Sequence, residues 1–176
     1  PKEPLFLWLK KELEKKDFKV TIPRMPKSSK PKINSWVNKL KKTVKDNENT
    51  FFIAHSIGCQ AVLRYIASLK NKRRFNLILI APWIHLDEET IREEGEEVRK
   101  IAEPWMETLI NYKKVLDHLN KRAVCIFSNN DPYIPISDIA LFRKKLKAKT
   151  ILLKNKGHFS ERDKVKKLPE ILKYIE

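Results

Sequence analysis

Apolar side chains recur along this chain at two spacings, one typical of helices and the other of strands. Helical stripes predict helices at 4–16, 33–44, 57–69 and 136–147, and a further one near the C-terminus at 168–175. Shorter apolar runs between them predict strands at 18–22, 50–54, 77–81, 123–128 and 150–153. Strands that alternate with helices indicate a mostly parallel sheet with helices on both faces, which is a three-layer α/β fold.

The alternation is interrupted between residues 83 and 119. Acidic side chains outnumber basic ones by eight to three over 86–104, which gives this stretch a net charge of −5. An apolar stripe at helical spacing follows, made of Trp105, Leu109, Tyr112, Leu116 and Leu119. We interpret 83–119 as a lid-like insertion in a single domain spanning 1–176, which should leave and rejoin the sheet at the same edge. The alternative is that the stripe packs on the sheet as core.

The chain of 176 residues carries a formal charge of +16, from 38 Lys and Arg against 22 Asp and Glu. Such an excess could attract nucleic acid or an anionic membrane. The lysines are scattered singly over polar helix faces, however, without the interleaved aromatic residues typical of nucleic-acid sites. We therefore expect a solvated surface with no specific nucleic-acid partner. We also expect no membrane association, since no apolar run approaches the roughly 20 residues of a membrane-spanning helix.

The cysteines and glycines exclude several classes of protein, among them disulfide-rich and nucleotide-binding proteins. Cys59 and Cys125 lie in apolar surroundings without the paired spacing of zinc or redox motifs, so we expect reduced core thiols in a cytoplasmic protein. The chain has three glycines, too few and too dispersed for a P-loop or a dinucleotide fingerprint. Its histidines and carboxylates show no metal-site spacing. We expect a protein that works without a cofactor or metal.

The stretch 51–58 reads Phe-Phe-Ile-Ala-His-Ser-Ile-Gly, an apolar strand followed by a turn at Ser56 and an immediate helix. This is the context of a nucleophile elbow, in which small residues two positions before and after the serine let backbones pass closely. Ala54 and Gly58 occupy those positions. The alternative is that Ser56 only caps the following helix.

Two more ionisable residues follow predicted strands. Asp131 comes soon after the strand at 123–128, and His158 follows the strand at 150–153. Alone, each would be an ordinary turn or loop residue. Together with Ser56 they arrive in the order Ser, Asp, His, each just past a different parallel strand, and the carboxyl ends of such strands share one edge of the sheet. The order therefore predicts a serine hydrolase triad.

The group types assign the predicted roles. Neutral His158 would remove the proton of Ser56 as the hydroxyl attacks an acyl carbon, and Asp131 would orient His158 and stabilise its cation. The backbone N–H of Ile57, at the start of a helix, would be one oxyanion donor. Its partner is expected from the loop after a first strand, which we place upstream of Pro1 and therefore outside this sequence.

Three stretches of the chain resemble a known family. These are Ala54-His55-Ser56-Ile57-Gly58-Cys59, Asp131-Pro132-Tyr133-Ile134-Pro135 and Gly157-His158-Phe159. They look like the YdeN and retinoblastoma-binding protein nine family of small serine hydrolases. The resemblance spans nearly the whole chain and implies a compact α/β-hydrolase fold, the triad named above and activity towards a small acyl substrate. The Leu-x-Cys-x-Glu motif is absent from the sequence, so retinoblastoma binding is not implied.

Several candidate positions remain around this centre. Met25, Trp83 and Trp105 are the candidates for lining the acyl pocket, since such pockets have mostly apolar walls. His55, His85 and His118 are interpreted as structural or solvated, and Asp138 is the runner-up for the triad acid. A different class of function is also open, in which the chain is a non-catalytic binding protein that attaches to acidic partners through its Lys-rich surface.

Overall fold

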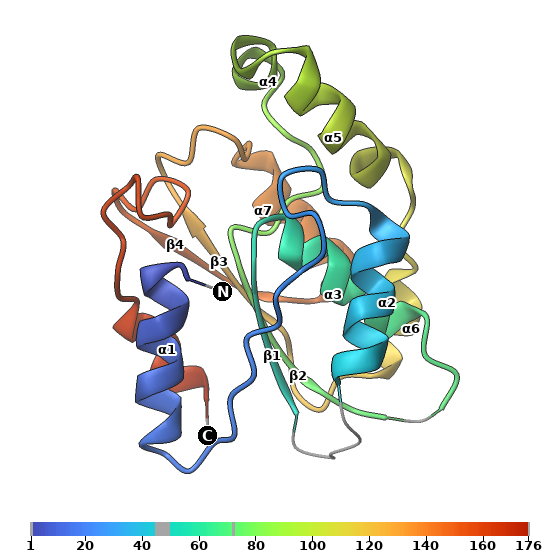
Figure 1. Ribbon diagram of the computed structural model, residues 1–176, viewed down its shortest axis with the longest axis vertical. Helices are drawn as coiled ribbons and strands as arrows, with labels where there is room; N and C mark the ends of the chain where they lie inside the picture. The colour runs from blue at the N-terminus through green and yellow to red at the C-terminus, as the bar shows by residue number, and fades with distance from the viewer. Residues whose placement is uncertain (1, 45–49, 72, 176) are drawn as a thin grey trace.

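The computed structural model describes residues 2–44, 50–71 and 73–175. Its sheet contains β1 (Phe51–His55), β2 (Asn76–Ile80), β3 (Val124–Ser128) and β4 (Lys149–Leu153) in the order β1-β2-β3-β4. All neighbouring pairs are parallel, with Phe51 opposite Asn76, Ile78 opposite Val124, and Val124 opposite Lys149. Each strand therefore ends at the same edge, which is uppermost in Figure 1.

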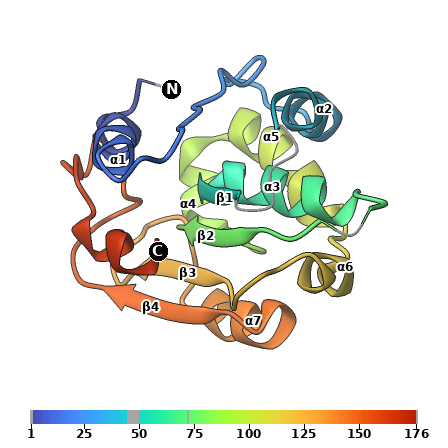
Figure 2. The same ribbon diagram turned by 90° about the horizontal axis from the view of Figure 1, so that it is seen from below.

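Helices cover both faces of the sheet, which confirms the predicted three-layer arrangement (Figure 2). One face carries α3 (Ile57–Ala67), α6 (Tyr112–Asp117) and α7 (Ser137–Leu146), with α2 (Ile33–Thr43) packed on the outer side of α3. The other face carries α1 (Pro4–Glu14) and the 3-10 helix η1 (Pro169–Tyr174). The C-terminal apolar stripe thus forms a 3-10 helix where an α-helix was predicted.

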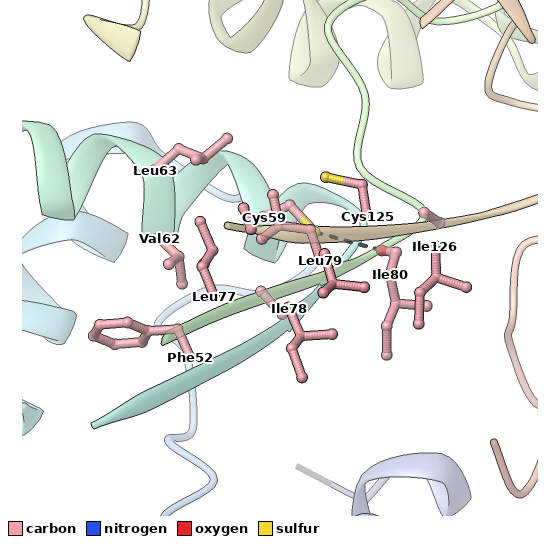
Figure 3. Close-up of a cluster of buried hydrophobic side chains, with 14 of the residues drawn as sticks. Phe52, Cys59, Val62, Leu63, Leu77, Ile78, Leu79, Ile80, Cys125 and Ile126 are labelled. Carbon is pink, nitrogen blue, oxygen red and sulfur yellow. Dashed lines mark hydrogen bonds between the residues drawn. The ribbon is translucent and has the colours of Figure 1, made fainter. Parts of the chain in front are cut away.

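Alternating strand side chains fill the two interfaces between the sheet and its helices. Figure 3 shows Leu77 on the side of Val62 and Leu63 from α3, while Ile78 and Ile80 point to the opposite side of β2. All of these side chains are buried. Burying one such side chain contributes about 1.5–3 kcal/mol to stability, so the sheet is a rigid base for the loops at its edge.

Residues 18–22 do not form the predicted strand. The backbone there is extended, but among the residues that the structure describes it pairs with no strand of the sheet. The Phe18 ring instead packs edge-on against Phe51 of β1, with 5.7 Å between ring centroids. The alternating apolar pattern of this segment is therefore explained by side-chain packing and not by ladder hydrogen bonds.

The segment 83–119 is a crossover between parallel strands, which corrects the prediction that it rejoins the edge it leaves, while its lid-like role stays a prediction. It leaves β2 at the carboxyl edge, where α4 (Glu88–Glu94) and α5 (Glu96–Glu107) lie (Figure 1). It ends at the opposite edge, where the N–H of Phe75 donates to the carbonyl oxygen of His118 at 2.8 Å. It cannot rejoin the edge that it left, because β3 is parallel to β2 and begins at the amino end.

The apolar stripe from 105 to 119 does not form one helix, because α5 contains only Trp105 of it, α6 contains Tyr112 and Leu116, and Leu109 and Leu119 lie outside both helices. Helix α5 ends at Glu107, and the side chain of Asn111 accepts a hydrogen bond from the N–H of Lys114 to begin α6. Leu109 lies in the break and is 92% exposed. The helix-capping residue Asn111 marks the break between the two helices, which the spacing of apolar residues alone does not reveal. Within the described ranges, no helix is both long and apolar enough to cross a membrane.

Candidate active site

Ser56 lies on a strained turn between β1 and α3. Its backbone angles are φ 52° and ψ −127°, in a region that non-glycine residues rarely occupy. The Ser56 N–H donates to the carbonyl oxygen of Ile80 at 2.9 Å, which fixes the turn to the neighbouring strand. The serine hydroxyl makes no capping bond to α3, so the capping alternative is excluded. A Cβ at Gly58 would meet no atom within 4 Å, so close approach does not explain that glycine.

The side chains of Ser56, His158 and Asp131 form one continuous chain of hydrogen bonds. The Ser56 Oγ lies 2.8 Å from His158 Nε2. The other ring nitrogen, Nδ1, lies 2.9 Å from Asp131 Oδ2 and 3.1 Å from Oδ1. The Asp131 side chain is 3% exposed and that of His158 is 16% exposed. Three residues that follow three different strands are thus joined side chain to side chain, with His158 in the middle.

Three consecutive side chains fasten the loop after β3 to the loop after β4. The Ser128 Oγ accepts from the N–H of Lys156 at 3.0 Å, and Asn129 Oδ1 accepts from the N–H of Asn155 at 2.8 Å. Asn130 Oδ1 accepts from the N–H of Gly157 at 2.9 Å. The Ser-Asn-Asn run before Asp131 therefore holds the backbone that leads to His158, a role that went unrecognised in the sequence.

The turn that carries His158 is built around the carboxylate of Asp163. One oxygen, Oδ2, accepts from the N–H groups of His158 and Ser160 at 3.0 Å each and from the Ser160 hydroxyl at 2.6 Å. Burial raises the pKa of Asp163, but these hydrogen bonds outweigh it and the net pKa is lowered. Gly157 has φ 50°, and a Cβ there would overlap the Asp163 carboxylate. A side chain at 157 would therefore displace the turn.

Comparison with known proteins agrees with this geometry. The family model described as serine hydrolase matches residues 6–176. This chain belongs to the serine hydrolase family. It is 26% identical over 167 residues to the Bacillus subtilis (strain 168) protein named "Putative hydrolase YdeN", covering 93% of this chain and 82% of that protein. Family membership supports hydrolase activity and speaks against the alternative of a non-catalytic binding protein.

Solved structures with the same fold include two hydrolase-related proteins. The crystal structure of the ydeN gene product from B. subtilis has a TM-score of 0.80 at 24% identity, covering 96% of this chain and 89% of that one. A structure from work on carboxylesterases of the thaumarchaeon Nitrososphaera gargenis has a TM-score of 0.62 at 11% identity, covering 97% and 83%. At these identities the likeness shows the fold, which is that of α/β hydrolases.

The remaining histidines of this serine hydrolase lie in three different settings. His118 Nδ1 contacts the carbonyl oxygen of Arg73 at 2.6 Å, at the amino edge of the sheet. His85 Nδ1 contacts Asp138 Oδ1 at 2.9 Å, and Asp138 Oδ2 also accepts from two backbone N–H groups. Asp138, the runner-up for the triad acid, therefore contacts His85 and not His158. His55 contacts the backbone of His158, between the sheet and α1.

Trp105 does not lie where a pocket wall was predicted. Its side chain is 1% exposed and packs edge-on against Trp36 of α2, with 5.9 Å between ring centroids. Its Nε1 donates to the carbonyl oxygen of Pro31 at 3.2 Å. The guanidinium of Arg64 lies over the ring and donates to the carbonyl oxygens of Trp105 and Thr108. Trp105 therefore joins α5 to α2 and α3, which is a structural role.

Trp83 and Met25 stay predictions as pocket residues. Trp83 is buried, and its carbonyl oxygen accepts from Gln60 Nε2 at 2.7 Å, one turn into α3 from Ser56. Met25 is partly buried against the core. A cavity of about 230 Å³ lies at the other end of the sheet, between the amino ends of the strands and η1, where Asn76 and Lys149 help to line it. Its position is opposite to that of Ser56, so it is not the acyl pocket.

We expect Trp105→Ala to lower the free energy of unfolding by about 3–5 kcal/mol, the usual cost of truncating a fully buried tryptophan. Urea titration followed by circular dichroism measures this, with Leu109→Ala as the control, since Leu109 is exposed and should change little. Relative rates across p-nitrophenyl esters of increasing chain length should stay the same. A shifted chain-length preference at unchanged stability would restore Trp105 as a pocket residue.

Proposed function

We propose that this serine hydrolase cleaves a small carboxylic ester through an acyl-enzyme intermediate on Ser56. The observation that carries the proposal is the unbroken hydrogen-bond chain from Ser56 Oγ through the His158 ring to the Asp131 carboxylate. The carboxylate accepts from Nδ1–H, so the free lone pair of the neutral ring lies on Nε2 and faces the serine hydroxyl. That is the tautomer that a general base needs.

The two halves of the reaction follow from this arrangement. His158 Nε2 takes the Ser56 proton as Oγ bonds to the acyl carbon, and the carbonyl π electrons move to oxygen. The tetrahedral intermediate collapses, the bond to the leaving oxygen breaks, and Nε2–H supplies the proton to the departing alcohol. Water then attacks the acyl-enzyme by the same route, releasing the carboxylic acid and restoring Ser56. Asp131 stabilises the transient imidazolium in both halves.

The backbone N–H of Ile57 is the proposed first donor of the oxyanion hole. Ile57 is the first residue of α3, so its N–H has no carbonyl partner within the helix, and the positive end of the helix dipole lies there. One such donor is worth about 3 kcal/mol in the transition state. The second donor, predicted from upstream of Pro1, stays a prediction.

The choice of an ester as the substrate class rests on supporting evidence of two kinds. An activated serine with a neutral histidine base is suited to acyl transfer, and no step needs a metal or cofactor. The fold is shared with a structure from work on carboxylesterases of N. gargenis. The proposed substrates are therefore small esters, with Met25 and Trp83 as the proposed acyl-pocket residues.

Labelling with a fluorophosphonate tests the proposal directly, because this reagent phosphonylates a serine activated by a base much faster than an unactivated one. The folded protein is labelled, digested and sequenced by mass spectrometry, with a urea-unfolded sample as the control. We expect one modified peptide, carrying the label on Ser56, in the folded sample alone. A label on another serine, or no label on a folded protein, would overturn the assignment.

A further inference from the structure

His55 is the last residue of β1 and lies directly before Ser56 in the chain, but its side chain faces the loop of His158. Its Nε2 lies 2.7 Å from the carbonyl oxygen of His158, and the two ring centroids are 5.0 Å apart. The ring of Phe6 from α1 is edge-on to His55, with 6.3 Å between centroids. The His55 ring is therefore held between α1 and the backbone that carries His158.

The partner fixes which nitrogen of His55 carries the proton. A carbonyl oxygen only accepts hydrogen bonds, so Nε2 must be the donor. Removal from water and the nearby His158 lower the pKa of His55 to about 4, so the ring is neutral at pH 7. A neutral donor suits this place, because His158 gains a positive charge during the reaction and a second cation beside it would oppose that charge.

The peptide groups flanking His158 are held from two sides. Asp163 accepts from the His158 N–H at 3.0 Å, and His55 donates to the His158 carbonyl oxygen. Among the described residues no strand pairing holds this turn, so these two bonds, together with those of the Gly157 N–H to Asn130 and the Phe159 N–H to the Lys156 carbonyl oxygen, set the position of the Cα from which the imidazole extends. A shift of about 1 Å in a reacting group can cost roughly 100-fold in rate.

We propose that His55 is a positioning residue, which fixes the backbone of His158 so that Nε2 meets the Ser56 hydroxyl and Nδ1 meets Asp131. The inference rests on the proposed function, since it concerns the accuracy of the same hydrogen-bond chain. His55 does not touch the reacting atoms itself. Its effect should therefore fall on turnover and not on substrate binding.

His55→Met tests this, because it replaces the imidazole donor with an apolar side chain of similar length. We expect kcat for p-nitrophenyl acetate to fall by about 10- to 100-fold, the range set by small misplacements of a catalytic group, with KM almost unchanged. His118→Met is the matched control. It removes another histidine bonded to a carbonyl oxygen, but at the opposite edge of the sheet. It should lower the melting temperature and leave kcat unchanged.

A second pair of variants decides the case in which His55→Met folds poorly. His55→Gln places an amide N–H near the position of the histidine Nε2, while His55→Asn carries the same amide too short to reach. The glutamine variant should recover most of the wild-type kcat and the asparagine variant should not. Equal kcat values for these two variants, or a wild-type kcat in folded His55→Met, would overturn the positioning role.

The failure of the proposed function gives a different result. In that case the wild-type protein itself would show no ester hydrolysis and no labelling of Ser56, whatever residue stands at 55. A labelled and active wild type with fully active His55→Met and His55→Asn variants would instead refute the inference alone.

Discussion

Ser56→Ala is expected to reduce kcat for ester hydrolysis by about 10⁶-fold, the loss typical of removing a serine nucleophile whose partners act as a unit. The fold should persist, because the Ser56 hydroxyl contacts His158 and caps no helix. Alanine should also tolerate the φ 52° turn about as well as serine does, since both carry a Cβ. Steady-state kinetics with p-nitrophenyl acetate and a thermal melt of the same preparation measure both quantities.

The matched control is Ser35→Ala, which removes an exposed serine hydroxyl on α2 and should change neither rate nor melting temperature. Retained hydrolysis in Ser56→Ala would show that the nucleophile lies elsewhere. A much lower melting temperature in Ser56→Ala would show that the Ser56 side chain is needed for the turn. The loss of activity in that variant would then say nothing about the nucleophile. Labelling by the fluorophosphonate then decides between these outcomes, since it reports on the unmutated serine.

The sequence was sufficient to predict the juxtaposition of Ser56, Asp131 and His158, because the topology of parallel strands determines it. Each residue follows a strand, and the strands are parallel, so their carboxyl ends meet at one edge. Strand periodicity and chain order are local properties that a single sequence displays. No knowledge of side-chain packing was needed to bring these loops together.

Packing between distant segments was not predictable in the same way. Trp105 and Trp36 are far apart in the chain, and their ring contact depends on how α5 and α2 cross. The position of His55 depends on a carbonyl oxygen 103 residues away, and a backbone acceptor leaves no trace in residue types. The direction of the 83–119 crossover could nevertheless have been predicted from the sequence, because a β3 parallel to β2 has to begin at the amino edge of the sheet.

The Ser-Asn-Asn run at 128–130 could be recognised in the sequence as a turn, but its hydrogen-bond partners could not be predicted. Such residues before an aspartate are common in turns, and their side chains bond the backbone in many ways. Here they accept from three successive N–H groups of 155–157, so two neighbouring strand-end loops act as one unit. This unit joins the base loop to the acid loop, which makes the geometry of His158 and Asp131 interdependent.

Asp131→Asn is expected to lower kcat by about 10⁴-fold, because the amide group can reverse the tautomer of His158. The N–H₂ group of the new amide would donate to Nδ1, which moves the ring proton to Nε2 and removes the acceptor that faces Ser56. KM should change little, since the native carboxylate is 3% exposed and lies behind the ring. Steady-state kinetics at pH 7 and above measure the loss, and higher pH should restore part of the rate through attack by solvent hydroxide.

Asp138→Asn is the comparison that separates an acid of the active site from a structural one. Asp138 is fully buried and accepts from the N–H groups of Ile84 and His85 and from the His85 ring. An amide can keep its oxygen for the two N–H groups and donate to the other tautomer of His85, but the loss of the negative charge weakens these hydrogen bonds, so the free energy of unfolding should fall by about 1–3 kcal/mol. Turnover should be nearly unchanged, because none of these contacts reaches His158. The 2.9 Å contact between Asp131 and His158 Nδ1 is the reason for expecting the loss of turnover in Asp131→Asn. If Asp138→Asn lost turnover and Asp131→Asn lost only stability, the roles of the two carboxylates would have to be exchanged.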